Sequence, residues 1–405
     1  MTLKEEFIKL GYTEEDYEII RNNYAVNQIK DETLIKKLKD NFAFLLKMGY
    51  TKEEAIKMTK SLPSIYGYSI ESMKQKIDDM ITLGYTKEEV IKMTKSSPSI
   101  YGLSIESIKQ KIEDMITLGY TKEEVIKMTK SLPAIYGYSI ESMKQKIDDI
   151  STLGYTKEEV VKITKSLPSI YSYSIENMKQ KIEDIISLGY TKEEVIKMTK
   201  SLPSIYGYSI ENIKQKIEDM VILGYTKEEV IKMTKSLPAI YSLSIENMKQ
   251  KIEDIISLGY TKEEVIKMTK NLPAIYGLSI ENMKQKIEDM ITLGYTKEEV
   301  IRMTKSFTPI YGLSIENMKQ KIDLYDSIDM HELAVINPKL LMQSVNLSYA
   351  RYSFYKDRGI DIDMNNYRKL FVEQKKFEKA YRITKKELLE KYDYDKYEEQ
   401  RKMKL

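Results

Sequence analysis

Pairs of adjacent carboxylates are the first residues in this sequence whose type and spacing could support acid–base catalysis. Two carboxyl groups in different environments can act as general acid and general base, and the chain offers Glu53-Glu54 and Asp78-Asp79. The same two pairs return in nearly every segment of the chain, with Glu or Asp at the first place of the second pair. Such regular return is typical of solvated helix faces, so we expect no catalytic residues.

Cysteine and histidine contribute almost nothing to the inventory of reactive groups. The absence of cysteine excludes thiolate metal sites and a cysteine nucleophile, and the single histidine, His331, excludes a site with several histidine ligands. All sixteen glycines fall at two positions of a repeated pattern, so none is left for a phosphate-binding loop. We therefore expect no metal, no cofactor, no small-molecule substrate and no enzyme activity.

Lysines form a second group of candidate residues, although the net charge of the chain is only +3. Lys60 lies near the end of a predicted helix that places no acid four residues away from it, and this lysine returns every thirty-five residues. A ladder of such lysines can contact a phosphate backbone. The alternative is that the lysines complement the helix dipole and keep the chain soluble. The candidate nucleic-acid-binding ladder is Lys60, Lys95, Lys130, Lys165, Lys200, Lys235, Lys270 and Lys305.

Basic residues are also concentrated towards the C-terminus, where the segment 339–386 holds twelve Lys or Arg and five Asp or Glu. Arginine binds phosphate and guanine in a bidentate manner that lysine cannot reproduce. The alternative is a solvated amphipathic cap. The candidate nucleic-acid-binding residues here are Arg351, Arg358, Arg368, Lys369, Lys375 and Lys376.

A thirty-five-residue repeat must position these side chains. In the stretch 50–84, Thr51 and Glu54 have the form of a capping box, Pro63 predicts a bend or short 3₁₀ turn, Ser69 predicts the start of a second helix, and Gly84 predicts a left-handed end. Eight such repeats follow one another without an insertion. Repeats of this length that each supply two helices predict an all-α solenoid superhelix without a sheet.

The chain divides into three predicted parts: a divergent N-terminal cap repeat (1–49), eight tandem repeats (50–322), and a divergent C-terminal repeat with basic capping helices (323–405). In the last part, Pro338, Ser344 and Gly359 keep the spacing of the bend, the second cap and the final glycine. Closing helices are expected at 365–380 and 385–392, followed by a charged tail that frays.

Two columns of side chains bear on what the repeats bind. Tyr66 and Tyr68 recur as tyrosines that either stack on bases or pack between repeats, and packing is the commoner role. The column of Ser72 holds serine in the first three repeats and asparagine in the next five, from Asn177 to Asn317. Because so few positions vary, we expect binding through backbone contacts and shape and little reading of sequence.

The motifs GYTxEE, LPxIY, SIExM and KIxDMIxLG resemble the repeat of the mitochondrial transcription termination factor (mTERF) family over residues 11–382. The segments 338–341 and 351–354 are similar to the closing motif of that family. The resemblance implies a superhelix whose concave groove holds nucleic acid, usually double-stranded DNA, and a role in transcription termination, organellar gene expression or RNA processing.

The function expected from these observations is binding of double-stranded DNA, or of RNA, in the regulation of gene expression and of transcription termination. The alternative is a scaffold that binds proteins on the same solenoid surface. The N-terminal residues have neither a secretory nor a transit-peptide pattern and no segment is apolar enough to cross a membrane. We therefore expect a cytoplasmic monomer without membrane contacts.

Overall fold

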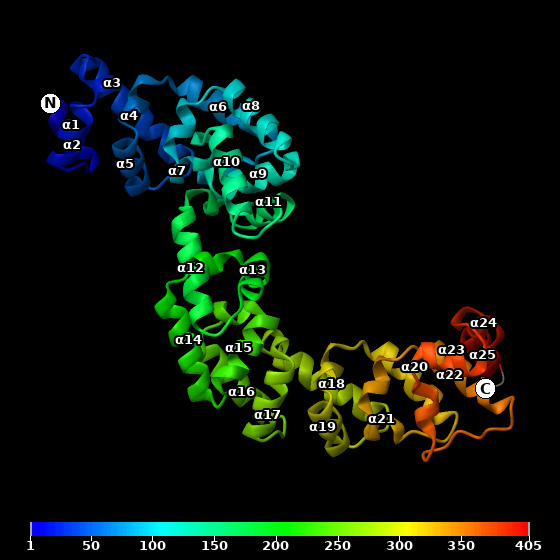
Figure 1. Ribbon diagram of the computed structural model, residues 1–405. Coiled ribbons are helices and arrows are strands. Elements are labelled where there is room, and N and C mark those ends of the chain that lie inside the picture. Colours follow the sequence, from blue (N-terminus) through cyan, green and yellow to red (C-terminus); the bar gives the residue numbers. More distant parts are fainter. Residues whose placement is uncertain (1, 404–405) are drawn as a thin grey trace. The chain divides into compact units, whose positions relative to one another are not determined.

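Helices joined by short turns make up the described chain, residues 2–403 of a computed structural model, and these residues include no strand (Figure 1). Each thirty-five-residue repeat forms a first helix (helix A), a 3₁₀ turn and a second helix (helix B). The prediction of an all-α solenoid built from two-helix repeats is therefore confirmed. None of the described helices combines the length and the apolar character that crossing a membrane requires.

The helix bounds follow the sequence period closely. Helices A are α5 (Lys52–Ser61), α7 (Lys87–Ser96), α9 (Lys122–Ser131), α11 (Lys157–Ser166), α13 (Lys192–Ser201), α15 (Lys227–Ser236), α17 (Lys262–Asn271) and α19 (Lys297–Ser306). Helices B are α6 (Ile70–Leu83), α8 (Ile105–Thr117), α10 (Ile140–Ser151), α12 (Ile175–Ser187), α14 (Ile210–Leu223), α16 (Ile245–Ile256), α18 (Ile280–Thr292) and α20 (Ile315–Asp326). The 3₁₀ turns between them are η1 (Pro63–Gly67), η2 (Pro98–Gly102), η3 (Pro133–Gly137), η4 (Pro168–Ser172), η5 (Pro203–Gly207), η6 (Pro238–Ser242), η7 (Pro273–Gly277) and η8 (Thr308–Gly312).

Local signals start and end these helices as the sequence predicts. The Thr51 side chain accepts a hydrogen bond from the Glu54 amide while the Glu54 carboxylate accepts one from the Thr51 amide, so two amides left free by the first turn are satisfied. Ser69 caps helix B in the same repeat. Gly84 ends that helix with φ of 115°, a left-handed conformation that favours glycine.

The eighth repeat shows that the bend does not depend on the exact place of proline. Thr308 occupies the first position of η8 and Pro309 the second, and the 3₁₀ turn forms as in the other repeats. Both positions lie in the first turn, where the missing amide of proline removes no helix hydrogen bond.

The N-terminal part consists of α1 (Leu3–Leu10), α2 (Glu14–Arg21), α3 (Tyr24–Asn27) and α4 (Asp31–Lys47). Thr13 and Asp16 form a capping box at α2. The short helix α3 stands where the other repeats have their proline turn. This part therefore keeps the two-helix plan although it lacks the bend proline.

The C-terminal part begins with one more divergent repeat, α21 (Leu333–Ile336), η9 (Pro338–Met342) and α22 (Val345–Lys356), as the proline and serine spacing predicts. The closing elements are η10 (Tyr367–Phe371), α23 (Gln374–Tyr381), α24 (Lys385–Lys391) and α25 (Tyr394–Lys402). The expectation of a frayed tail is wrong for α25, because Tyr394 is buried and Tyr397 stacks on Tyr349 with ring centroids 4.5 Å apart. Residues 404 and 405 of that tail lie outside the described residues.

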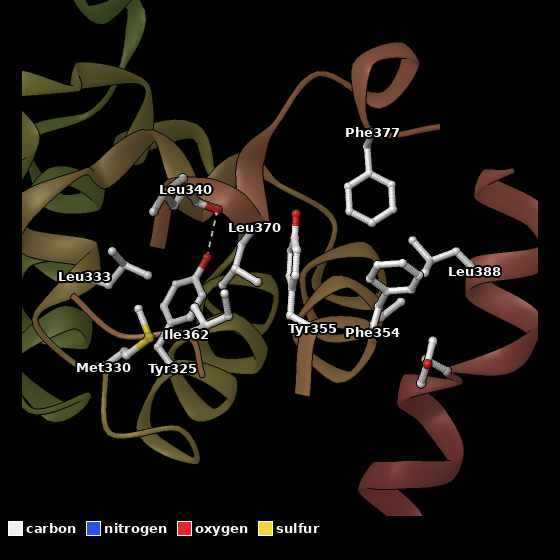
Figure 2. Packing of buried hydrophobic residues seen from close by; sticks show 12 residues of the cluster. Tyr325, Met330, Leu333, Leu340, Phe354, Tyr355, Ile362, Leu370, Phe377 and Leu388 are labelled. Carbon is white, nitrogen blue, oxygen red and sulfur yellow. Dashed lines mark hydrogen bonds between the residues drawn. The ribbon is translucent and has the colours of Figure 1, made fainter. Parts of the chain in front are cut away.

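The chain divides into two compact units, Met1–Ile210 and Glu211–Leu405. In the second unit the closing elements η10, α23 and α24 share one apolar cluster with the last repeat (Figure 2). Figure 2 shows Phe354, Phe377 and Leu388 facing one another, and the hydroxyl of Tyr325 donates a hydrogen bond to the Leu340 carbonyl at 3.4 Å. These three elements are thus packed on the last repeat as one core, and Tyr394 of α25 packs in a second cluster with Leu324 and Val345.

Candidate nucleic-acid interface

The ladder lysines lie at the ends of helices A, and within each compact unit they pair with the preceding repeat. Lys95 contacts the carboxylate of Glu54 at 2.7 Å, and Glu54 is the same residue that closes the capping box of its own helix. The sequence suggested no acidic partner because it placed none on the helix of the lysine. The partner instead lies on the helix A of the preceding repeat, forty-one residues earlier in the chain than the lysine.

The same pair repeats along the array at 2.5 to 2.8 Å in Lys95–Glu54, Lys130–Glu89, Lys165–Glu124, Lys200–Glu159, Lys270–Glu229 and Lys305–Glu264. Lys60 pairs with Asp16 of the N-terminal cap, and Lys235 lies half-buried at the same place in α15. The seven paired lysines therefore join helices of consecutive repeats, and the charge of each is already opposed by a carboxylate before any ligand binds.

The pairing changes the acid–base behaviour of the glutamates. The hydrogen bond from Lys95 is the largest influence on Glu54, and it lowers the pKa of that carboxyl below its usual range; the amide of Thr51 acts in the same direction. Lys130 has the same effect on the pKa of Glu89. The glutamates are thus held in the charged form that both the lysine and the capping box require.

Buried hydroxyl groups form a second connection between repeats. The Tyr85 hydroxyl lies 2.6 Å from the Thr129 hydroxyl and 2.5 Å from the Tyr136 hydroxyl, both of which belong to the following repeat. Burial raises the pKa of Tyr85 and of Tyr136. A buried hydroxyl without a partner would destabilise the fold, so these triads specify how one repeat sits on the next.

Equivalent triads lie at Tyr50–Thr94–Tyr101, Tyr120–Thr164–Tyr171, Tyr155–Thr199–Tyr206, Tyr225–Thr269–Tyr276 and Tyr260–Thr304–Tyr311. The tyrosines of the Tyr66 column are therefore packing residues, and their rings are not available for stacking on bases. The triads were not predicted from the sequence. A threonine in the middle of every apolar helix A face was the signal, because a buried hydroxyl must find a partner.

A second lysine column is also engaged within the array. Lys146 on α10 donates a hydrogen bond to the Tyr173 carbonyl at 2.7 Å, and Lys251 on α16 donates one to the Leu278 carbonyl at 2.6 Å. Each acceptor lies just after the 3₁₀ turn of the following repeat. Two of the five lysines in a repeat thus hold neighbouring repeats together.

Arg351 requires a correction to the predicted interface. Only 3% of this residue is exposed, and its guanidinium donates hydrogen bonds to the Leu370 carbonyl and to Gln374 Oε1, both at 2.8 Å. The guanidinium also lies 4.8 Å from the centre of the Phe377 ring. A side chain held inside the core in this way cannot reach a phosphate, so Arg351 is a structural residue of α22.

A chain of hydrogen bonds extends from Arg351 through the closing helices. Gln374 Nε2 donates to Glu378 Oε1 at 2.8 Å, and the same carboxylate oxygen accepts the Lys385 amide at 2.8 Å. The hydrogen bond from Gln374 is the largest influence that lowers the pKa of Glu378. The chain therefore fixes α23 and the first residue of α24 relative to α22.

Most of the basic residues of this segment lie on the outside of those fixed elements. We call the residues Arg368, Lys369, Lys375, Lys376, Lys379, Arg382, Lys385 and Lys386 the C-terminal platform; all eight are exposed. The segment 367–386 contains only two acids, Glu373 and Glu378. One of them pairs with Lys376 at 3.4 Å, and the other belongs to the internal hydrogen-bond chain. Lys386 also pairs with Glu390 of α24 at 3.8 Å, so the platform is a surface on which six of the eight basic side chains make no ion pair with the described residues.

Arg358 lies apart from the platform although it is exposed. Its guanidinium stacks on Phe354, 3.4 Å from the ring centre, and donates a hydrogen bond to the Phe354 carbonyl at 3.1 Å. Of the predicted C-terminal residues, Arg368, Lys369, Lys375 and Lys376 are exposed on the consecutive elements η10 and α23. Arg351 is inside the core and Arg358 lies at the end of α22.

The single histidine joins the last regular repeat to the divergent one. His331 stacks on Tyr295 with ring centroids 4.3 Å apart, and its Nδ1 lies 2.6 Å from Asp326 Oδ1. Across the part of the chain that the structure describes, no three His, Cys, Asp or Glu side chains are placed to hold a metal ion.

The chain consists of stacked two-helix repeats with a 3₁₀ turn, and buried hydroxyl groups join each repeat to the next. It also carries a basic platform. These features are those of a helical-repeat binding protein. The mTERF family model matches residues 5–152, 118–222, 149–257 and 220–378. The chain belongs to the mTERF family, a family of non-enzymatic repeat proteins that bind nucleic acid, and the resemblance found in the sequence is confirmed. No curated protein matches the sequence.

Proposed function

We propose that this protein binds double-stranded DNA through the C-terminal platform and thereby regulates transcription, including its termination. The observation that carries the proposal is the platform itself, where eight exposed basic side chains are accompanied by two acids whose charges are already engaged. Phosphate contacts by lysine and arginine supply most of the affinity of a non-specific complex with nucleic acid. Family membership supports the same class of ligand.

The condition of the tyrosines favours a duplex over a single strand. Proteins that hold single strands present exposed aromatic rings on which successive bases stack. In the Tyr66 column, the recurring tyrosines such as Tyr101, Tyr136 and Tyr171 are buried and bonded through their hydroxyls. A duplex, which needs phosphate contacts and no stacking surface, therefore suits the available side chains better.

The proposal is tested by measuring the affinity for a mixed-sequence DNA duplex at several salt concentrations. The variant Arg368→Gln/Lys369→Gln/Lys375→Gln removes three exposed charges from the platform. We expect weaker binding and a salt slope reduced by as much as about 2.7, because each phosphate contact contributes about 0.9. Fluorescence anisotropy of a labelled duplex measures both quantities.

A matched control removes the same number of charges elsewhere. Lys57, Lys92 and Lys127 are exposed on helices A of the first unit and make no ion pair within residues 2–403. The variant Lys57→Gln/Lys92→Gln/Lys127→Gln should keep nearly the parental affinity and slope. Equal losses in the two variants would argue against the platform as the binding site.

A further inference from the structure

The exposed face of helix B differs in charge from the platform. In the fourth repeat this face carries the exposed acids Glu176 and Glu183 and the half-buried Asp184, while Lys179 is the one exposed base of α12. The remaining base, Lys181, is half-buried and donates a hydrogen bond to the Tyr208 carbonyl at 2.5 Å. Acids thus outnumber the available bases on this face. A phosphate backbone is repelled by such a surface and a basic ligand is attracted to it.

A groove opens on this face where helix B meets the 3₁₀ turn of the next repeat. Its volume is about 500 Å³, and it lies between α12 and η5. Asn177, Gln180 and Asp184 line it on the helix side, and Tyr206 and Gly207 line it on the side of the turn. The groove therefore places a carboxylate and two side-chain amides within reach of one ligand.

The side-chain amide of Asn177 has free hydrogen-bonding groups. The serines at the equivalent position of the first three repeats do not. In the first three repeats the hydroxyls of Ser72, Ser107 and Ser142 each donate to the carbonyl of the helix cap at 2.8 Å. Among residues 2–403, the side-chain amide of Asn177 meets no such partner. The exchange of serine for asparagine therefore converts an internally satisfied group into an available donor and acceptor.

Three consecutive repeats of the second unit carry asparagine at the same position of helix B, and the first two of them also carry the aspartate seven residues later, where the third has Leu324. Asn247, Asn282 and Asn317 are exposed on α16, α18 and α20, and their side-chain amides are likewise unpaired in the described chain. The carboxylates of Asp254 and Asp289 each accept one hydrogen bond from a glutamine four residues earlier, at 2.9 Å. Since α16 packs on α18 and α18 on α20, these asparagines form a continuous row.

We propose that this row of asparagines binds an extended basic polypeptide segment. The amide of asparagine can pair with the N–H and C=O groups of an extended main chain, which supplies affinity without requiring a particular sequence. The lysines or arginines of the segment then meet the carboxylates of Asp254 and Asp289. Packed helices lie about 8–10 Å apart and an extended chain advances about 3.4 Å per residue. The segment therefore places a basic residue on the row at about every third position.

The experiment uses the full chain and a labelled twelve-residue peptide with lysine at every third position and glycine or serine between. The variant Asn247→Ser/Asn282→Ser/Asn317→Ser removes the row without endangering the fold, because serine occupies this place in the first three repeats. Three lost hydrogen-bonding groups should weaken binding by about tenfold or more. The same peptide with glutamate in place of lysine should not bind.

The converse variant, Ser72→Asn/Ser107→Asn/Ser142→Asn, builds a second row in the first unit and should raise the number of peptides bound per chain, as measured by calorimetry. Unchanged peptide affinity in the serine variant, or no binding of the lysine peptide at low salt, would overturn the proposal. If the serine variant instead loses affinity for a single-stranded oligonucleotide and not for the peptide, the row takes nucleic acid and the proposal is wrong.

The two proposed sites are distinguishable in these measurements. The row variants should bind the DNA duplex as the parent does, because they leave the C-terminal platform intact. The platform variant Arg368→Gln/Lys369→Gln/Lys375→Gln should bind the lysine peptide as the parent does. Either binding activity can thus fail without the other.

Discussion

Arg351 and Arg368 are the same type of residue only seventeen positions apart, yet one is inside the core and the other is on the surface. The guanidinium of Arg351 donates hydrogen bonds to the Leu370 carbonyl and to the Gln374 side chain. Without Arg351 these two acceptors would lose their donor. Burial lowers the pKa of Arg351, and the group stays charged at any physiological pH because its ordinary pKa is so high. Its role is to place the elements that carry the platform.

Replacing Arg351 by methionine should therefore destabilise the chain. The change removes two hydrogen bonds of a charged donor and leaves their acceptors buried, so we expect a loss of about 3 kcal/mol in the free energy of unfolding. Urea denaturation followed by circular dichroism measures the loss. Arg368→Met, at an exposed residue, serves as the control and should change stability by less than about 0.5 kcal/mol. Equal stabilities of the two variants would contradict the structural role of Arg351.

Helix A shows how one acidic residue can serve its own helix and the next. Glu54 closes the capping box at the start of α5 and also receives Lys95 from the end of α7. The carboxylate lies near the positive end of one helix dipole, and the lysine lies near the negative end of another, so both positions are electrostatically favourable. The sequence predicts the first contact because it is local. The second depends on how the repeats stack.

The lowered pKa of these glutamates predicts a loss of stability in acid. A carboxyl whose pKa is lower in the folded than in the unfolded chain stabilises the fold above the unfolded value, about 4.3 for glutamate, and this contribution is lost as the pH falls through the folded value. We expect the thermal midpoint to fall between about pH 5 and pH 3. The variant Glu54→Gln/Glu89→Gln/Glu124→Gln/Glu159→Gln should show a smaller fall, because glutamine keeps the capping box and does not titrate.

A control for this acid effect replaces four exposed glutamates on helices B, in Glu71→Gln/Glu106→Gln/Glu141→Gln/Glu176→Gln. That variant should show the same fall in thermal midpoint as the parent. The ladder has no part in acid stability if the two sets of glutamine variants respond to pH alike.

At the scale of the whole chain, stability is distributed among many similar contacts between neighbours, as in other solenoids. The helix bounds, the 3₁₀ turns and the caps were all predictable, since Thr51, Pro63, Ser69 and Gly84 act on residues close in sequence. The tyrosine triads and the lysine–glutamate pairs were not, because their members lie forty-one to fifty-one residues apart. The burial of Arg351 could not be predicted from the sequence either, since the charge of a residue does not show whether its side chain is exposed.

The basic residues have two different tasks: ladder lysines join repeats, and we propose that platform residues contact DNA. Chemical acetylation of the lysines, read by mass spectrometry with and without a DNA duplex, tests this division directly. Lys369, Lys375 and Lys376 should be reactive in the free protein and protected in the complex. Lys95, Lys130 and the rest of the ladder should react weakly and equally in both. Protection of the ladder by DNA, with the platform lysines unchanged, would contradict the account.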